Sequence, residues 1–223
     1  MIKENVLRVR EAVPAGVIIV AVSKGRSIEE IKEVVEAGIT DIGENKVQEA
    51  LKKFSSRLTG SPANPQTKLH MVGHLQSNKA KDAVKIFDLI HSVDSLPLAS
   101  EIDRQASKIN KIQDILIEIK TSPEATKFGF KPGEANTAIE KISTFKNLNI
   151  KGLMTIAPIV DDPEKTRPYF RILRELKDKI NALQITPYAL HILSMGMTDD
   201  FRIALEEGSN MLRLGRAIFA GTE

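Results

Sequence analysis

The most constraining feature of the sequence is a regular alternation between short apolar runs and longer amphipathic segments along the whole chain. The first apolar run, "VIIVAV" at residues 17–22, is made mostly of β-branched residues and lies between Gly16 and Gly25. A continuous run of this kind is typical of a strand covered on both faces, as in a parallel sheet. Strands that alternate with helices predict βα units and a parallel sheet.

Eight apolar runs of strand length can be counted. They occupy residues 17–22, 39–43, 69–73, 88–93, 114–120, 150–156, 189–195 and 211–216. Helices are predicted before the first run and between the others, at about residues 2–12, 27–38, 45–57, 77–85, 96–108, 132–143, 163–181 and 198–207. Within one of these, Ser27 followed by Glu30 predicts a capping box, and Gly38 predicts the helix end.

Eight strands with their helices in 223 residues fit a compact (β/α)8 barrel better than an open doubly wound sheet, which usually has fewer strands. We therefore expect an α/β fold, a single TIM-barrel domain over residues 1–223 with an extra N-terminal helix. The Pro/Gly/Ser-rich stretch 58–68 predicts a surface loop before the third strand.

Composition excludes several classes of function. The chain has no Cys, and its 4 His residues lack HExxH spacing, so we expect no disulfide and no metal site. Basic and acidic residues, 32 and 29 in number, are interspersed, and there is no Trp, so no nucleic-acid surface is expected. No apolar run approaches the roughly 20 residues of a membrane span. The expectation is a cytoplasmic protein that binds neither nucleic acid nor a membrane.

In a parallel barrel the site lies at the carboxyl ends of the strands, so the residues that follow each run are the candidates for function. These positions are rich in polar residues and glycine: Ser23, Lys24, Glu44, Asn45, His74, Gln76, Ser77, Asn78, Lys79, Ser194, Gly196, Gly215 and Arg216.

Arg213 lies in the last run, "MLRLGR". Because side chains alternate along a strand, Leu212 and Leu214 share one face, and Met211 and Arg213 share the other. The leucines belong against the helices, which turns Arg213 into the barrel. A buried guanidinium needs a partner. Two interpretations stay open: an internal ion pair with an acid such as Glu118, or contact with a ligand.

The segment "LSMGMTDD" at residues 193–200 offers an anion site, with Thr198 placed to cap a new helix. Backbone N–H groups beside Gly196 and a helix N-terminus bind anions, and loops after strands seven and eight often hold phosphate in barrels. Gly215 allows a second close backbone approach. The two aspartates after Thr198 oppose this interpretation, because acidic residues in a first turn already interact with the helix dipole.

Lys24 follows the first strand. A lysine in a desolvated pocket loses its proton more readily and attacks carbonyl carbon to form a Schiff base, although a lone lysine is more often a solvated one. Together with a phosphate site and an inward arginine, Lys24 points to a small molecule that carries an aldehyde and a phosphate. Pyridoxal 5′-phosphate (PLP) is the candidate.

Eight collinear segments carry a family resemblance. They are "AVSKG", "GENKVQE", "HMVGHLQSNK", "IHSVDS", "ATKFGF", "GLMTIAP", "LSMGMTDD" and "RLGRAIFAG". Together they resemble the YggS/PROSC family of pyridoxal-phosphate homeostasis proteins over nearly the whole chain. The family often has an aromatic residue where this chain has Leu69, which affects only local packing.

The resemblance implies a barrel similar to the N-terminal domain of alanine racemase. It implies PLP as the cofactor, held on Lys24 as a Schiff base, with Arg213 near the pyridine nitrogen and Asn45 lining the pocket. The predicted phosphate surroundings are Ser194, Met195, Gly196 and Gly215. An arginine beside the ring nitrogen would keep it unprotonated and weaken the cofactor as an electron sink, which fits a carrier.

The remaining polar candidates have simpler interpretations. His70 lies in an apolar strand and is expected to be a hydrogen-bonded structural residue, whereas His74 is a candidate ligand or acid/base group. Lys79 and Lys127 are interpreted as solvated lysines or as contacts to the cofactor's surroundings.

Three functions compete. The preferred one is a PLP carrier or regulator, without strong catalytic activity, that buffers the cofactor or delivers it to apo-enzymes. The second is a racemase-type PLP enzyme, for which Tyr169 and Tyr188 are poorly placed as a second base. The third is a Schiff-base aldolase, whose lysine would normally follow a later strand. Without a racemase-type dimerisation domain, the barrel is expected to be a monomer.

Overall fold

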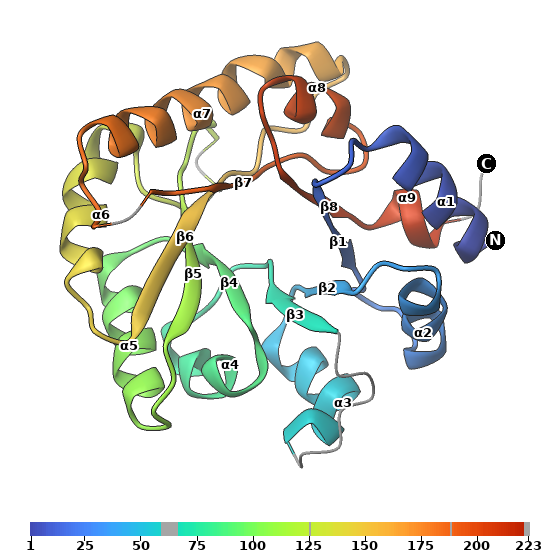
Figure 1. Ribbon diagram of the computed structural model, residues 1–223, viewed down its shortest axis with the longest axis horizontal. Helices are drawn as coiled ribbons and strands as arrows, with labels where there is room; N and C mark the ends of the chain where they lie inside the picture. The colour runs from blue at the N-terminus through green and yellow to red at the C-terminus, as the bar shows by residue number, and fades with distance from the viewer. Residues whose placement is uncertain (59–66, 125, 188, 221–223) are drawn as a thin grey trace.

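The structure is a computed structural model that describes residues 1–58, 67–124, 126–187 and 189–220. Parallel strands close into a barrel in the chain order β1 to β8, with helices around the outside (Figure 1). The strands are β1 (Ile18–Val22), β2 (Asp41–Glu44), β3 (Lys68–Met71), β4 (Leu89–Val93), β5 (Gln113–Glu118), β6 (Leu148–Met154), β7 (Ile192–Ser194) and β8 (Met211–Leu214). The predicted fold class is confirmed, and each predicted run contains or overlaps one strand.

The helices follow the predicted order with small differences at their ends. The α-helices are α1 (Ile2–Ala12), α2 (Ile28–Glu36), α3 (Val47–Leu58), α4 (Ala80–Ile86), α5 (Leu96–Ser107), α6 (Ala135–Ser143), α7 (Arg167–Ala182), α8 (Phe201–Glu206) and α9 (Arg216–Phe219). Short 3-10 turns lie at η1 (Ser77–Lys79), η2 (Pro132–Glu134) and η3 (Pro163–Thr166). The predicted loop at 58–68 falls largely on residues 59–66, which lie outside the described residues.

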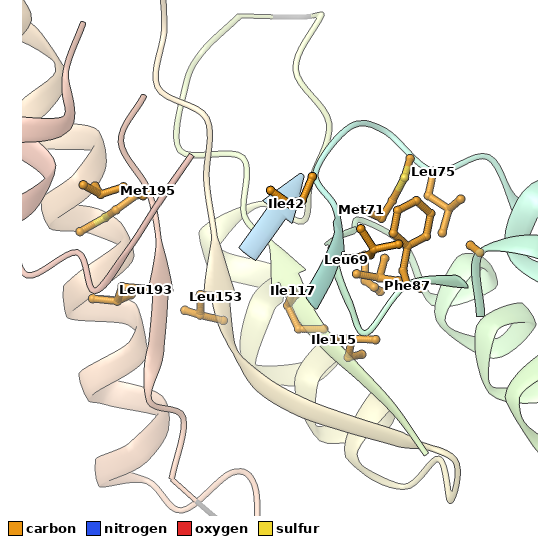
Figure 2. Packing of buried hydrophobic residues seen from close by; sticks show 14 of the residues in the cluster. Ile42, Leu69, Met71, Leu75, Phe87, Ile115, Ile117, Leu153, Leu193 and Met195 are labelled. Atoms are coloured by element: carbon orange, nitrogen blue, oxygen red, sulfur yellow. The ribbon is translucent and has the colours of Figure 1, made fainter. Parts of the chain in front are cut away.

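The alternation of side chains along each strand separates two apolar regions. Leu212 and Leu214 face outward into the core between sheet and helices, which also contains Leu153, Leu193 and Met195 (Figure 2). Inside the barrel a smaller group packs across the axis, and it comprises Val20, Val72, Leu89, Leu116, Met154 and Met211. The inward direction predicted for Arg213 follows from the same alternation and is confirmed, because its side chain is buried and bonded inside the barrel.

Closure of the barrel brings the two ends of the chain together. Strand β8 pairs with β1 in parallel, with Val20 opposite Arg213. Outside this pair, α1 lies against α9 (Figure 1), where the Asn5 side chain donates hydrogen bonds to the carbonyls of Ile218 and Ala220. The residues after β1 and β8 therefore share one part of the barrel rim.

The predicted helix signals are confirmed at α2 and wrong at α8. Ser27 and Glu30 form the complete capping box, and Gly38 follows the helix with φ of 99°. Helix α8 begins at Phe201 with Asp200 at its N-cap, so Thr198 does not cap it. The Asp200 carboxylate instead accepts a hydrogen bond from the Met197 N–H and holds a turn before the helix. The short helix α9 was not expected from the sequence.

Within the described part of the chain, no helix is both long enough and apolar enough to cross a membrane.

Candidate functional site

The predicted site residues lie at the carboxyl ends of four adjacent strands. Lys24 follows β1, Asn45 follows β2, and Gly215 follows β8, while Ser194 ends β7. The barrel order places β7, β8, β1 and β2 side by side. Closure of the sheet thus brings residues from opposite ends of the sequence to one side of the barrel mouth.

Lys24 lies in the turn between β1 and α2, and its side chain is exposed. The prediction that this lysine is desolvated is wrong for this conformation. The turn reverses the chain at Gly25, whose φ of 70° is a left-handed conformation that favours glycine. Lys24 therefore stands on the rim, above the buried end of the strand.

A network of ionic side chains holds this turn from below. The Lys53 ammonium donates to the Ser23 carbonyl at 2.7 Å, and to the carboxylates of Glu44 and Glu49, each at 2.8 Å. Glu49 in turn accepts the Gly25 N–H at 2.6 Å. The hydrogen bond from Lys53 lowers the pKa of Glu49, whereas burial raises the pKa of Glu44. This ionic network was not predicted from the sequence, because Lys53 and Glu49 have the pattern of ordinary residues on an exposed helix face.

A cavity of about 430 Å³ opens beside Lys24. It is lined by Lys24, Asn45, Lys46, Val47, Gln48, Met71, Gly73, His74, Leu75, Gln76 and Lys79. Three of these residues are lysines, so an anionic ligand is favoured there. The side-chain oxygen Oδ1 of Asn45 is buried without a hydrogen-bond partner in the structure, which leaves an acceptor available at this edge of the mouth.

Arg213 is buried inside the barrel at 4% exposure. Its Nη1 donates to the Ser194 hydroxyl at 2.6 Å, and its Nη2 donates to the Thr155 carbonyl at 2.8 Å. Of the two interpretations left open for the guanidinium, the ion pair with Glu118 is not formed among the described residues, and contact with a ligand stays a prediction. Burial lowers the pKa of Arg213 to about 10, while the charges of Asp200 and Glu118 oppose that effect, so the guanidinium remains charged near neutral pH.

A chain of hydrogen bonds continues from Ser194 across the barrel interior. The Ser194 hydroxyl lies 3.0 Å from Nδ1 of His91, and Nε2 of His91 lies 2.9 Å from Nδ1 of His70. Nε2 of His70 lies 2.9 Å from the Asp41 carboxylate at the start of β2. His70 is thus the hydrogen-bonded structural residue predicted for it. No local sequence pattern connects His91 and Asp41 with the site, because the hydrogen-bonded residues come from four different strands.

The far side of the mouth is formed by the segments after β3, β4 and β5. His74 approaches the Asp94 carboxylate at 3.1 Å and stacks on Phe128, with ring centroids 3.7 Å apart. Lys127 pairs with Glu124 at 3.7 Å. Glu118, at the end of β5, is 5% exposed.

Gly196 and Gly215, the two glycines predicted to lie near the phosphate, have different surroundings. A Cβ atom on Gly196 would lie 2.6 Å from the Ala204 Cβ, and φ at Gly196 is 95°, so the fold itself requires glycine there. A Cβ on Gly215 would meet the Val22 carbonyl oxygen at 3.6 Å, which is ordinary contact. The packing therefore does not demand glycine at 215, and the absence of a side chain leaves space at the rim.

The residues before Gly196 face inward and outward in turn. Ser194 points into the barrel, where its hydroxyl already contacts Arg213 and His91. The Met195 side chain packs in the outer core (Figure 2), and its N–H donates to the Met211 carbonyl. Their predicted contact with phosphate stays a prediction, and for Met195 only backbone atoms are on the side of the mouth.

Comparisons with known proteins agree with this geometry. Residues 1–223 match the family described as alanine racemase, N-terminal domain. A pyridoxal phosphate homeostasis protein of Aquifex aeolicus is 41% identical over 191 residues, which are 86% of this chain and 81% of that protein. The protein of the same name from Synechocystis sp. is 38% identical over 206 residues, 92% of each chain.

Solved structures give the same assignment. PipY of Synechococcus elongatus, in a structure with PLP bound, matches with a TM-score of 0.89 at 35% identity, covering 99% of this chain and 100% of PipY. Alanine racemase of Clostridium difficile matches with a TM-score of 0.80 at 16% identity, covering 99% of this chain and 56% of the racemase, which shows the shared fold alone. The chain therefore belongs to the alanine racemase N-terminal domain family, and within it to the group of the pyridoxal phosphate homeostasis proteins.

Proposed function

We propose that this protein binds PLP at the mouth of its barrel and takes part in PLP homeostasis, with Lys24 as the residue that holds the cofactor covalently. The observation that carries the proposal is the position of Lys24, in the turn after β1, the strand that pairs with β8, and beside a cavity that three lysines help to line. When bound, PLP supplies an electrophilic aldehyde carbon and a dianionic phosphate.

The residues present fit this cofactor in their chemistry. An exposed amine suits an aldehyde, and the buried, unpartnered Oδ1 of Asn45 can accept a hydrogen bond from a ligand. Gly215 leaves room for a ligand close to the backbone. Arg213 retains N–H groups beyond the two that it uses, and we assign it to the ring nitrogen. We assign the phosphate to the backbone around Gly196 and Gly215.

We further propose that the protein is a carrier or regulator and not an efficient enzyme. Racemisation in both directions needs a second base opposite the lysine. Of the two tyrosines, Tyr169 lies in α7 and packs against the outer core, away from the mouth, and Tyr188 lies outside the described residues. Support for a carrier also comes from the exposure of Lys24, because an accessible amine allows a recipient apo-enzyme to approach the cofactor. We propose one domain over residues 1–223, acting as a cytoplasmic monomer.

The experiment that tests the proposal is peptide mass spectrometry after incubation with PLP and reduction with borohydride. Condensation of the amine with the aldehyde releases one water, and hydride reduction makes the link stable. We expect the adduct on Lys24. In Lys24→Ala it should disappear, whereas Lys46→Ala and Lys79→Ala, which alter lysines of the same cavity, should retain it. An adduct confined to another lysine, or none in the parent protein, would contradict the assignment.

The racemase alternative is tested separately, by following loss of optical activity of L-alanine with the PLP-loaded protein. We expect no turnover above that of free PLP. Sustained turnover that disappears in Lys24→Ala would replace the carrier by an enzyme.

A further inference from the structure

Three residues of the hydrogen-bonded chain inside the barrel, His91, His70 and Asp41, have no role in the assignments above. His91 is 0% exposed and His70 is 2% exposed, and the barrel interior also contains apolar side chains such as Leu116 and Met154. Two buried imidazoles are costly unless every ring nitrogen has a partner. Here all four ring nitrogens have one, which indicates a built arrangement.

One assignment of the protons gives every donor in the chain an acceptor. The Asp41 carboxylate can only accept, so Nε2 of His70 carries a proton. The Arg213 guanidinium can only donate, so the Ser194 oxygen accepts from it. Among the described residues the other contact given for this hydroxyl is Nδ1 of His91, so that nitrogen is assigned as the acceptor of the hydroxyl proton. Nε2 of His91 then donates to Nδ1 of His70. Both imidazoles are neutral in this arrangement, with their protons on Nε2.

Protonation of His91 would disrupt this order. An imidazolium would donate from both nitrogens, so Ser194 would receive two donors and its own proton would lose its acceptor. A second positive charge would also stand near Arg213. Burial lowers the pKa of His91, and the charges of His70 and Arg213 lower it further, which agrees with a neutral His91 in this proton assignment.

We propose that His91, His70 and Asp41 are positioning residues that act through Ser194 to set the orientation of Arg213 toward a ligand in the barrel mouth. We call this chain of hydrogen bonds the relay. It runs from Asp41, the first residue of β2, to Arg213 near the end of β8. In this proton order the Ser194 oxygen accepts from Nη1, while the Thr155 carbonyl accepts from Nη2. Three of the five N–H groups of the guanidinium then remain for other partners.

This inference rests on the proposed function only for the identity of the ligand, because the relay itself can be observed in the ligand-free protein. The first test is ¹⁵N NMR of the imidazole nitrogens in protein labelled at histidine, which has 4 such residues. We expect His91 and His70 in the ligand-free protein each to carry a single ring proton, on Nε2. A proton on Nδ1 of either residue, or an imidazolium, would overturn the proposal.

The second test compares two substitutions of His91. His91→Leu removes both ring contacts, whereas the amide oxygen of His91→Asn can still accept from Ser194. We expect His91→Leu to weaken PLP binding roughly tenfold or more, the effect of losing one hydrogen bond that orients a charged group. His91→Leu should also change the absorption spectrum of the bound cofactor. In His91→Asn, the PLP affinity and the absorption spectrum should lie between those of His91→Leu and those of the parent protein.

Met154→Leu is the matched control, since Met154 is buried in the barrel interior outside the relay. It should leave affinity and spectrum unchanged. Equal affinity and an identical spectrum in His91→Leu and the parent would refute the positioning role. Failure of the parent protein to bind PLP would instead refute the proposed function, and the NMR result would still decide the proton order.

Discussion

Replacement of Glu118 by glutamine should change how the stability of the protein depends on pH. Glu118 is 5% exposed at the end of β5. Burial, together with the negative charge of Asp94, raises the pKa of its carboxyl from 4.5 to about 7, although Arg213 and Lys127 oppose the increase. The folded protein therefore holds a proton on Glu118 under conditions in which the unfolded chain has released it.

The magnitude follows from the two pKa values. The folded state binds more protons than the unfolded state between pH 4.5 and about 7, so this carboxyl makes the free energy of unfolding fall as pH rises through that window. A pKa difference of one corresponds to about 1.36 kcal/mol. Titration of a single group with these values lowers stability by about 2.5 kcal/mol between pH 5 and pH 8. Glutamine does not titrate, so the Glu118→Gln variant avoids this loss.

Urea unfolding of the ligand-free protein at several pH values between 5 and 8 measures the effect. The difference in unfolding free energy between Glu118→Gln and the parent cancels the titration of all other groups. We expect this difference to move in favour of the variant by about 2.5 kcal/mol across the range. Glu140→Gln, at an exposed position on α6, is the control and should run parallel to the parent. A constant difference for Glu118→Gln would refute the reasoning.

Three further substitutions test local features of the fold. Gly196→Ala should lower the unfolding free energy by about 2–4 kcal/mol, because its Cβ would lie 2.6 Å from the Ala204 Cβ at a φ of 95°; stability within 1 kcal/mol of the parent's would contradict this. Gly215→Ala should change stability by no more than about 1 kcal/mol but weaken PLP binding measured by fluorescence titration, and unchanged affinity would show that the space at the rim is not used. Ser27→Ala should cost about 1 kcal/mol, since the capping box is complete; this is measured by urea unfolding, and a loss below the error of the method would count against the cap.

The helix signals show where local sequence was sufficient and where it failed. The capping box at Ser27 was predictable because both partners lie within one turn of chain. Thr198 has equally good capping chemistry, yet its hydroxyl accepts the N–H of Ala217 in the first turn of α9, and α8 starts later. When a side chain has two possible backbone partners, the tertiary fold determines which of them lies close enough to form the hydrogen bond.

Some features of the fold and of the candidate site were likewise predictable from local sequence. The sequence alone determined the barrel, because apolar runs of strand length that alternate with amphipathic segments can bury their surfaces in few other ways. It also determined that Arg213 points inward, since strand alternation is a local property. The position of Lys24 at the end of the first strand was equally local.

Only the tertiary structure decided the partners of these residues. The sequence left an acid and a ligand open as partners of Arg213, whereas the fold supplies the hydroxyl of Ser194 and the carbonyl of Thr155. The relay through His91 and His70 to Asp41 crosses the barrel between strands far apart in the chain. Local patterns determine which face a side chain takes, but the register and closure of the sheet determine which atoms meet inside it.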